Sequence, residues 1–156
     1  ENLFEKDNLL LLILEHITDP HNVGACIRTA AAAGVDAVIV PKNRSCHLTP
    51  TVRKISSGGA ELIPFVVVTN IVRTINKLQS EGVMIYGTDM KASKLHNEIT
   101  YGDKSALIIG SEDKGLKRLT LENCDEIIKV KMPGRIESLN ASVSTGIMLF
   151  QMINQQ

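Results

Sequence analysis

Short runs of apolar residues alternate with helical stretches along this chain. The first run, Leu9 to Leu14, contains no polar residue, which is typical of a strand buried on both faces of a sheet. Shorter apolar runs predict further strands over residues 37–40, 62–68, 83–86, 106–109 and 127–130. Helices are predicted between them over residues 23–33, 50–57, 71–82 and 140–153. This alternation predicts an α/β domain with a mostly parallel sheet flanked by helices.

Residues that favour helix ends support these boundaries. Gly34 is predicted to end the first helix, and Pro50 suits the first position of the second. The predicted N-cap residues are Asn22, Thr49, Asn70 and, for the last helix, Ser138 or Asn140. Since no linker, repeat or low-complexity segment interrupts the pattern, we expect residues 1–156 to form a single domain.

The composition limits how this chain can bind nucleic acid. Lys and Arg total 17, Asp and Glu total 17, and aromatic residues make up only 3% of the chain. A domain that holds RNA by itself is usually basic, and it often stacks bases on aromatic rings. We therefore expect weak RNA binding by this chain alone, with a partner domain or a locally basic site supplying the rest.

The cysteines and histidines form no pattern of a disulfide or a metal site. The cysteines are Cys26, Cys46 and Cys124, an odd number without a C-x-x-C pair, which favours a reduced cytoplasmic setting. His16, His47 and His96 are scattered without metal-ligand spacing. The longest apolar run is too short to cross a membrane. We expect a cytoplasmic protein with no metal and no membrane partner.

Three polar segments, each containing glycine, follow predicted strands directly. They cover residues 19–29, 110–116 and 132–142. Ligands of such folds bind at the carboxyl ends of parallel strands, so we expect the three segments to gather at one edge of the sheet. Each segment also has a simpler interpretation. Arg28 can be a surface residue paired with Asp19 or Glu15, and Glu112 can pair with Lys114.

The three segments together resemble the sequence motifs of the SpoU (TrmH-like) family of RNA 2′-O-ribose methyltransferases, in the SPOUT superfamily. The matching patterns are Asn22-x-Gly24-x-x-x-Arg28-Thr29, Gly110-x-Glu112-x-x-Gly115-Leu116 and Met132-x-Gly134-x-x-x-Ser138-Leu139-Asn140-x-Ser142. The resemblance covers nearly the whole chain, from about Leu9 onward. Residues 18–22, 37–42 and 124–126 are most similar to bacterial 23S rRNA guanosine-2′-O-methyltransferases.

This resemblance implies a deep C-terminal trefoil knot, a homodimer with its sites near the interface, and S-adenosylmethionine (AdoMet) as methyl donor. The implied cofactor-binding residues are Thr88, Gly110, Glu112, Val130, Met132, Ser138, Leu139 and Asn140. The implied catalytic residues are Arg28, Asn22, Glu112, Ser138 and Asn140. Because a guanidinium stays protonated, we expect Arg28 to hold the target phosphate and stabilise developing alkoxide charge rather than act as a base.

The RNA target remains open between a guanosine of 23S rRNA and a tRNA ribose, and a non-catalytic RNA-binding module on the same scaffold is the third reading. A dinucleotide-binding Rossmann enzyme is disfavoured, since the first turn has only Gly24 and the second strand ends in Pro41-Lys42. The candidate phosphate contacts are Arg44, Arg53, Lys54 and Arg135. Relatives often carry a small N-terminal RNA-binding domain, which we expect to be absent here.

Overall fold

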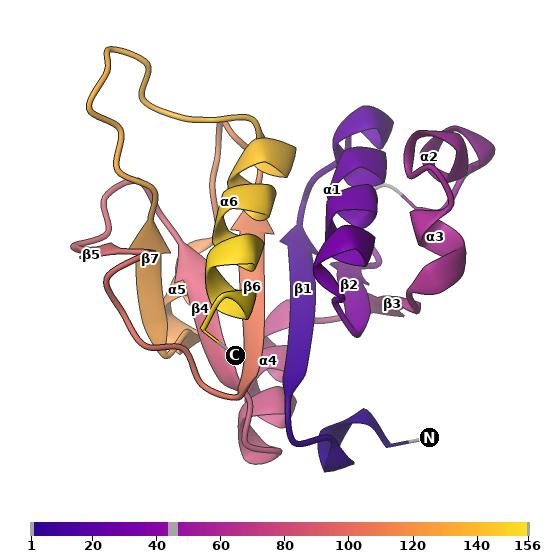
Figure 1. The fold of residues 1–156 in the computed structure, drawn as a ribbon, viewed down its shortest axis with the longest axis horizontal. Helices are drawn as coiled ribbons and strands as arrows, with labels where there is room; N and C mark the ends of the chain where they lie inside the picture. Colours follow the sequence, from indigo (N-terminus) through magenta and orange to yellow (C-terminus); the bar gives the residue numbers. More distant parts are fainter. Residues whose placement is uncertain (1, 44–46, 156) are drawn as a thin grey trace.

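The computed structural model describes residues 2–43 and 47–155. Within them one sheet has the strand order β3-β2-β1-β6-β4-β7-β5, and all paired neighbours run parallel (Figure 1). The strands are β1 (Leu9–Glu15), β2 (Ala37–Pro41), β3 (Phe65–Val68), β4 (Met84–Thr88), β5 (Lys94–Leu95), β6 (Lys104–Gly110) and β7 (Glu126–Lys129). The prediction of a parallel α/β domain is confirmed.

Helices cover both faces of the sheet and explain the first apolar run. The helices are η1 (Leu3–Glu5), α1 (Pro20–Ala33), α2 (Pro50–Ile55), α3 (Gly59–Leu62), α4 (Ile71–Ser80), α5 (Arg118–Asn123) and α6 (Ala141–Ile153). Leu10, Leu12 and Leu14 of β1 belong to the core cluster shared with α1 and α6. The alternate residues Leu9, Leu11 and Ile13 belong to the cluster shared with α4. Each residue of β1 is therefore buried, on one face or the other.

The start of α1 corrects one prediction. The helix begins at Pro20, and its N-cap is Asp19, whose side chain accepts a hydrogen bond from the His21 backbone N–H. Asn22 is therefore not the cap. A proline is favoured in the first helical position because it lacks the N–H that would go unpaired there. This earlier start leaves the Asn22 side chain available for other contacts. The predicted ends at Gly34, Thr49 and Asn70 are confirmed.

The segment around residue 62 was predicted wrongly as a continuous strand. Residues 59–62 form α3, and β3 starts only at Phe65, after Pro64. Gly59 lets α3 approach α1 closely. A Cβ at that position would lie 3.1 Å from the Ile27 carbonyl oxygen. The short elements β5 and α5 were also missing from the prediction.

The parallel sheet places several loops at one edge. The carboxyl ends of β1, β6, β4 and β7 lead into residues 16–19, 111–117, 89–93 and 130–140 respectively. In Figure 1 the last of these loops extends beyond the sheet edge, and α6 then runs beside α1 on the same face. The trefoil knot stays a prediction. Within the described ranges, no helix combines the length and the apolarity that crossing a bilayer requires.

Candidate functional site

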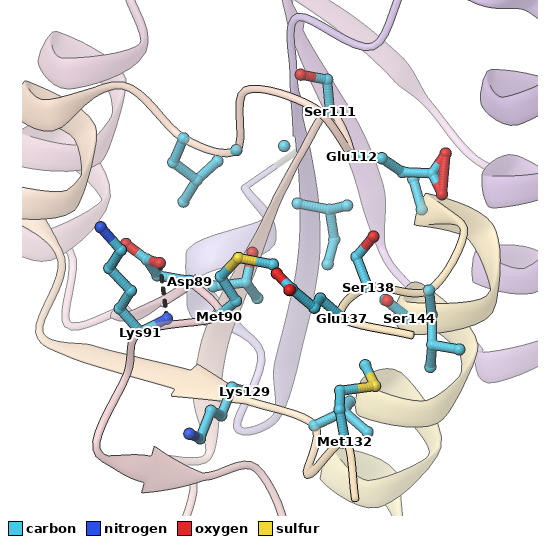
Figure 2. Close-up of a pocket in the computed structure, with 18 of the residues that line it drawn as sticks. Asp89, Met90, Lys91, Ser111, Glu112, Lys129, Met132, Glu137, Ser138 and Ser144 are labelled. Carbon is cyan, nitrogen blue, oxygen red and sulfur yellow. Dashed lines mark hydrogen bonds between the residues drawn. The ribbon is translucent and has the colours of Figure 1, made fainter. Parts of the chain in front are cut away.

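A cavity of about 800 Å³ opens at the carboxyl ends of β4, β6 and β7. This volume lies within the range of roughly 300–1,000 Å³ typical of small-molecule sites. Its walls come from residues 88–91, 109–116 and 128–139, with three residues of α6. Figure 2 shows labelled side chains from these segments around one open space. Strand topology has thus brought together segments that lie far apart in the sequence.

Most of the predicted cofactor residues line this cavity. They are Thr88, Gly110, Glu112, Val130, Met132, Ser138 and Leu139. Asn140 is not among the lining residues, and instead caps α6. The structure adds lining residues that the motifs did not single out, namely Asp89, Met90, Lys91, Lys129, Ser144 and Met148. Position gave a usable signal for the first four, because each lies at a strand's carboxyl end or directly after it.

The loop after β6 is a tight turn that presents charged groups. The Gly115 N–H donates to the Ser111 carbonyl oxygen at 2.8 Å, and Gly115 has a φ of 64°, in the left-handed region. A Cβ on Gly110 would lie 2.6 Å from the Gly115 backbone, so this turn requires glycine there. Glu112 stands exposed at the tip. Within the described part of the chain it makes no ion pair with Lys114, so the simpler interpretation of Glu112 is not supported.

The cavity combines apolar walls with hydroxyl groups. Its apolar lining includes Ile109, Leu116, Ile128, Val130, Met132 and Met148. Ser111, Ser138 and Ser144 add hydroxyls, and the Thr88 hydroxyl donates to the Ile108 carbonyl oxygen at 2.9 Å.

Cys124, which does not line the cavity, has a shifted pKa. Burial and then the charge of Asp125 raise the pKa of the Cys124 thiol to about 12. A thiol with that pKa is protonated at neutral pH, so Cys124 does not provide a nucleophile.

A second, smaller cavity of about 230 Å³ adjoins the first. The two share the lining residues Ser111, Glu112, Asp113 and Ala141. The rest of the smaller cavity comes from the end of β1 and the start of α1, namely His16, Ile17, Thr18, Asp19 and Asn22. His16 has a φ of 57°, which is uncommon for a residue other than glycine. The first and second motif segments therefore meet in this smaller cavity.

A hydrogen bond joins the first and third motif segments. The Asn140 side-chain nitrogen Nδ2 donates to Asn22 Oδ1 at 3.0 Å. Asn140 Oδ1 accepts from the Ser142 backbone N–H at 2.8 Å and from the Ser142 hydroxyl at 2.6 Å. The amide of Asn140 is thus held at both ends. This contact brings two predicted catalytic residues together at the starts of α1 and α6.

Arg28 lies apart from these groups. Its side chain is exposed on α1 and lines neither cavity. It has no hydrogen bond or ion pair with another described residue, so the predicted surface pairing is not observed. Glu15 is instead buried, and accepts from the Lys117 backbone N–H at 2.9 Å and the Thr120 hydroxyl at 2.5 Å.

The candidate phosphate contacts that the structure describes lie on two separate elements, and none of them lines either cavity. Arg53 is ion-paired with Glu61, and Lys54 is exposed on α2. Arg135 is exposed on the loop between β7 and α6. Arg44 and Cys46 lie outside the described residues. Among the residues that are described, no group of three or more His, Cys, Asp or Glu side chains is placed to hold a metal ion.

The fold and site define a parallel α/β domain with two adjoining cavities at the carboxyl ends of its strands, lined between them by residues of all three motif segments. The chain belongs to the SpoU rRNA Methylase family, whose model matches residues 9–150. It is 50% identical over 147 residues to the 23S rRNA (guanosine-2'-O-)-methyltransferase RlmB of Pseudomonas aeruginosa, covering 94% of this chain and 59% of that protein. It is 48% identical over 150 residues to RlmB of Escherichia coli, covering 96% of this chain and 62% of that protein.

A solved structure of a methyltransferase is similar over nearly the whole chain. The AdoMet-bound rRNA methyltransferase from Sinorhizobium meliloti superimposes with a TM-score of 0.89 at 25% identity, over 99% of this chain and 60% of that one. The chain therefore spans about three fifths of the length of these relatives.

Proposed function

We propose that this chain is the catalytic domain of an RNA 2′-O-ribose methyltransferase that uses S-adenosylmethionine, with a guanosine of 23S rRNA as its target. The observation that carries the proposal is the convergence of the motif segments. Segments two and three form walls of the large cavity, and segments one and two meet in the adjoining one. The names of the curated relatives support the choice of RNA and nucleoside.

The residues of the large cavity fit the methyl donor. Its apolar wall suits an adenine ring, and the carboxylates of Asp89 and Glu137 suit the donor's ammonium and sulfonium charges. The turn that requires glycine at position 110 keeps backbone groups close to the cavity. We assign donor binding to the lining residues Thr88, Gly110, Glu112, Val130, Met132, Ser138 and Leu139. Asn140 does not line the cavity, and would support the donor site through its hydrogen bonds to Asn22 and Ser142.

The chain's own groups would position the acceptor. When bound, S-adenosylmethionine supplies an electrophilic methyl group. The protein has to hold a ribose 2′-oxygen in line with it, and such positioning contributes roughly 7–11 kcal/mol in well-oriented reactions. Asn22 offers its amide nitrogen to the acceptor. Arg28 holds the adjacent phosphate and stabilises negative charge that develops on the 2′-oxygen.

We also propose a homodimer formed through α6. Val143, Ile147 and Phe150 lie at helical spacing on this helix and are 48%, 37% and 39% exposed. An apolar stripe of this kind is characteristic of a surface that another chain covers. Arg28 is on α1, whose next residue, Thr29, lies 3.5 Å from where a Cβ on Gly146 of α6 would stand. A site near the interface accounts for the position of Arg28 outside both cavities.

We also propose a cytoplasmic location, because an enzyme acting on bacterial ribosomal RNA works in the cytoplasm.

Calorimetric titration of S-adenosylmethionine and, separately, NAD into the purified chain tests the donor assignment. We expect saturable binding of S-adenosylmethionine and none of NAD. Ser138→Ala and Met132→Ala should weaken that binding, whereas Lys54→Ala, an exposed site away from the cavity, should leave it unchanged. Binding of NAD alone, or of neither compound, would contradict the proposal.

A further inference from the structure

We propose that the smaller cavity receives the base of the target nucleotide, and that Asp113 selects guanine there. This inference rests on the proposed function, because a methyl acceptor must lie beside the methyl donor. The smaller cavity adjoins the large one, and the two share the lining residues Ser111, Glu112, Asp113 and Ala141. At about 230 Å³ it is too small for a whole cofactor, and suits one part of a nucleotide.

The charges of the lining exclude a phosphate. The smaller cavity is lined by the carboxylates of Asp19, Glu112 and Asp113, and none of its described lining residues is Lys or Arg. Lys114 is in the same turn but lines only the large cavity. Carboxylates repel phosphate and accept hydrogen bonds from N–H and O–H groups. The cavity therefore suits an uncharged group rich in donors, with the phosphates remaining outside.

Guanine fits this description better than the other bases. Its Watson–Crick edge presents two adjacent donors, N1–H and N2–H₂, which match the two oxygens of one carboxylate. The same edges of adenine, cytosine and uracil each place an acceptor next to a donor, which opposes a carboxylate. Bases that enter an enzyme pocket are read through hydrogen bonds on this edge. Ile17 and Ala141 add apolar surface within the same cavity.

Of the three carboxylates, Asp113 is the one left to recognise a base. Asp19 is occupied by capping α1, where it accepts from the His21 N–H at 2.9 Å. Glu112 belongs to the proposed catalytic group. Asp113 is exposed at the tip of the turn, lines both cavities and has no hydrogen bond or ion pair with another described residue. Its position at the junction of the cavities suits a group that fixes the base while the ribose faces the donor.

The test compares Asp113→Asn with a matched control, Asp103→Asn, whose side chain is exposed and lines neither cavity. Unmodified 23S rRNA transcript is methylated by the wild-type chain, and mass spectrometry locates the methylated nucleotide. A second transcript then carries inosine, which lacks the N2 amine, at that position. Single-turnover rates are measured for both RNAs, and S-adenosylmethionine affinity by calorimetry.

We expect Asp113→Asn to lower the rate on the guanosine RNA roughly 10- to 100-fold, with donor affinity unchanged, and Asp103→Asn to behave as wild type. The wild-type chain should methylate the inosine RNA more slowly than the guanosine RNA, whereas Asp113→Asn should methylate the two RNAs at similar rates. The inference is wrong if Asp113→Asn matches the wild-type rate, if it still discriminates against inosine, or if the wild-type product is not a guanosine. The first two results leave the proposed function standing. A product other than guanosine also overturns its choice of target, and a wild-type chain that methylates no RNA ends both proposals.

Discussion

Asn140 donates its side-chain N–H to Asn22, and this single contact sets which atoms Asn22 presents to the site. Asn140 Oδ1 is engaged by two donors of Ser142, so its nitrogen must face Asn22. Asn22 must then use its oxygen as acceptor, which leaves its own Nδ2 facing away with two N–H groups. The contact between two motif segments far apart in sequence therefore leaves the Asn22 amide nitrogen as a hydrogen-bond donor, on a residue that lines the smaller cavity.

Asn140→Asp separates this effect from helix capping. Aspartate still caps α6, so we expect a melting temperature close to that of the wild type. It cannot donate to Asn22, whose amide must then turn and present oxygen instead of nitrogen. Methyl transfer should fall at least about tenfold, as expected for one lost hydrogen bond at a reacting group. Asn140→Ala should show the same loss of transfer, with an added stability loss of about 1 kcal/mol. Equal transfer by Asn140→Asp and wild type would contradict this role.

Arg28→Ala tests whether an exposed arginine outside both cavities takes part in the reaction. Since Arg28 has no partner among the described residues, its removal should change stability by less than about 0.5 kcal/mol. If it stabilises charge on the acceptor, transfer should drop roughly 100-fold or more while donor affinity is kept. Lys77→Ala, which removes an exposed cation on α4 that lines neither cavity, is the control. Near-normal transfer by Arg28→Ala would remove it from the mechanism.

Gly110→Ala should distort the turn that carries Glu112 and Asp113. Its Cβ would lie 2.6 Å from the Gly115 backbone, a distance that forces the loop to move. We expect a loss of stability and much weaker S-adenosylmethionine binding, measured by thermal unfolding and calorimetry. Gly146→Ala is the matched control, because its Cβ would sit 3.5 Å from Thr29 and favour the helix. If both variants bind the donor equally, the turn does not shape the donor site.

The α6 stripe predicts how the chain sediments. The wild type should run as a dimer, at twice its chain mass of 17.0 kDa. Ile147→Glu places a charge in the stripe, and should give a monomer with reduced methyl transfer. Leu62→Glu, at a residue that is 77% exposed on α3, should remain dimeric. A wild-type chain that sediments as a monomer at micromolar concentration would exclude this interface.

His96 predicts a loss of stability in acid. Its ring is buried, neither ring nitrogen has a hydrogen-bond partner among the described residues, and burial lowers its pKa. The unfolded chain, with the ordinary His pKa of about 6.5, therefore binds more protons than the folded one below that pH. Stability contributed by the neutral ring is present above about pH 6.5 and declines as the pH falls through it. Thermal unfolding at pH 7.5 and 5.5 should show a smaller decline for His96→Leu than for wild type. An equal decline would mean that other groups control it.

The sequence predicted the sheet well because β1 and its neighbours are buried on both faces, which produces uninterrupted apolar runs. Strand topology predicted that the segments containing Gly110 and Ser138 meet at one edge of the sheet, and both residues line the large cavity. Thr88 also lines it, but was expected there only from the family resemblance. The sequence analysis failed where tertiary contacts decide the structure. Residues 59–62 form a helix that packs closely against α1 at Gly59, and α1 begins at Pro20 because Asp19 rather than Asn22 caps it.

The proposed role of Asp113 could not be predicted from the sequence either. The family motif includes its neighbour Glu112 but not Asp113, and the smaller cavity that Asp113 lines exists only in the folded structure. Asn22 illustrates the same limit of sequence analysis. The motif singled it out, but its partner Asn140 lies 118 residues further along the chain. A pattern within one segment contains no information about which atom such a residue presents.

The most direct test of the central claim is mass spectrometry of nucleosides after the chain is incubated with S-adenosylmethionine and unmodified 23S rRNA transcript at micromolar concentration. The RNA is digested to nucleosides and fragmented, so that a methyl group on the ribose is distinguished from one on the base. We predict 2′-O-methylguanosine, dependent on S-adenosylmethionine and strongly reduced in Asn140→Asp. A chain that binds the donor but yields no methylated ribose, or that methylates a base, would contradict the account.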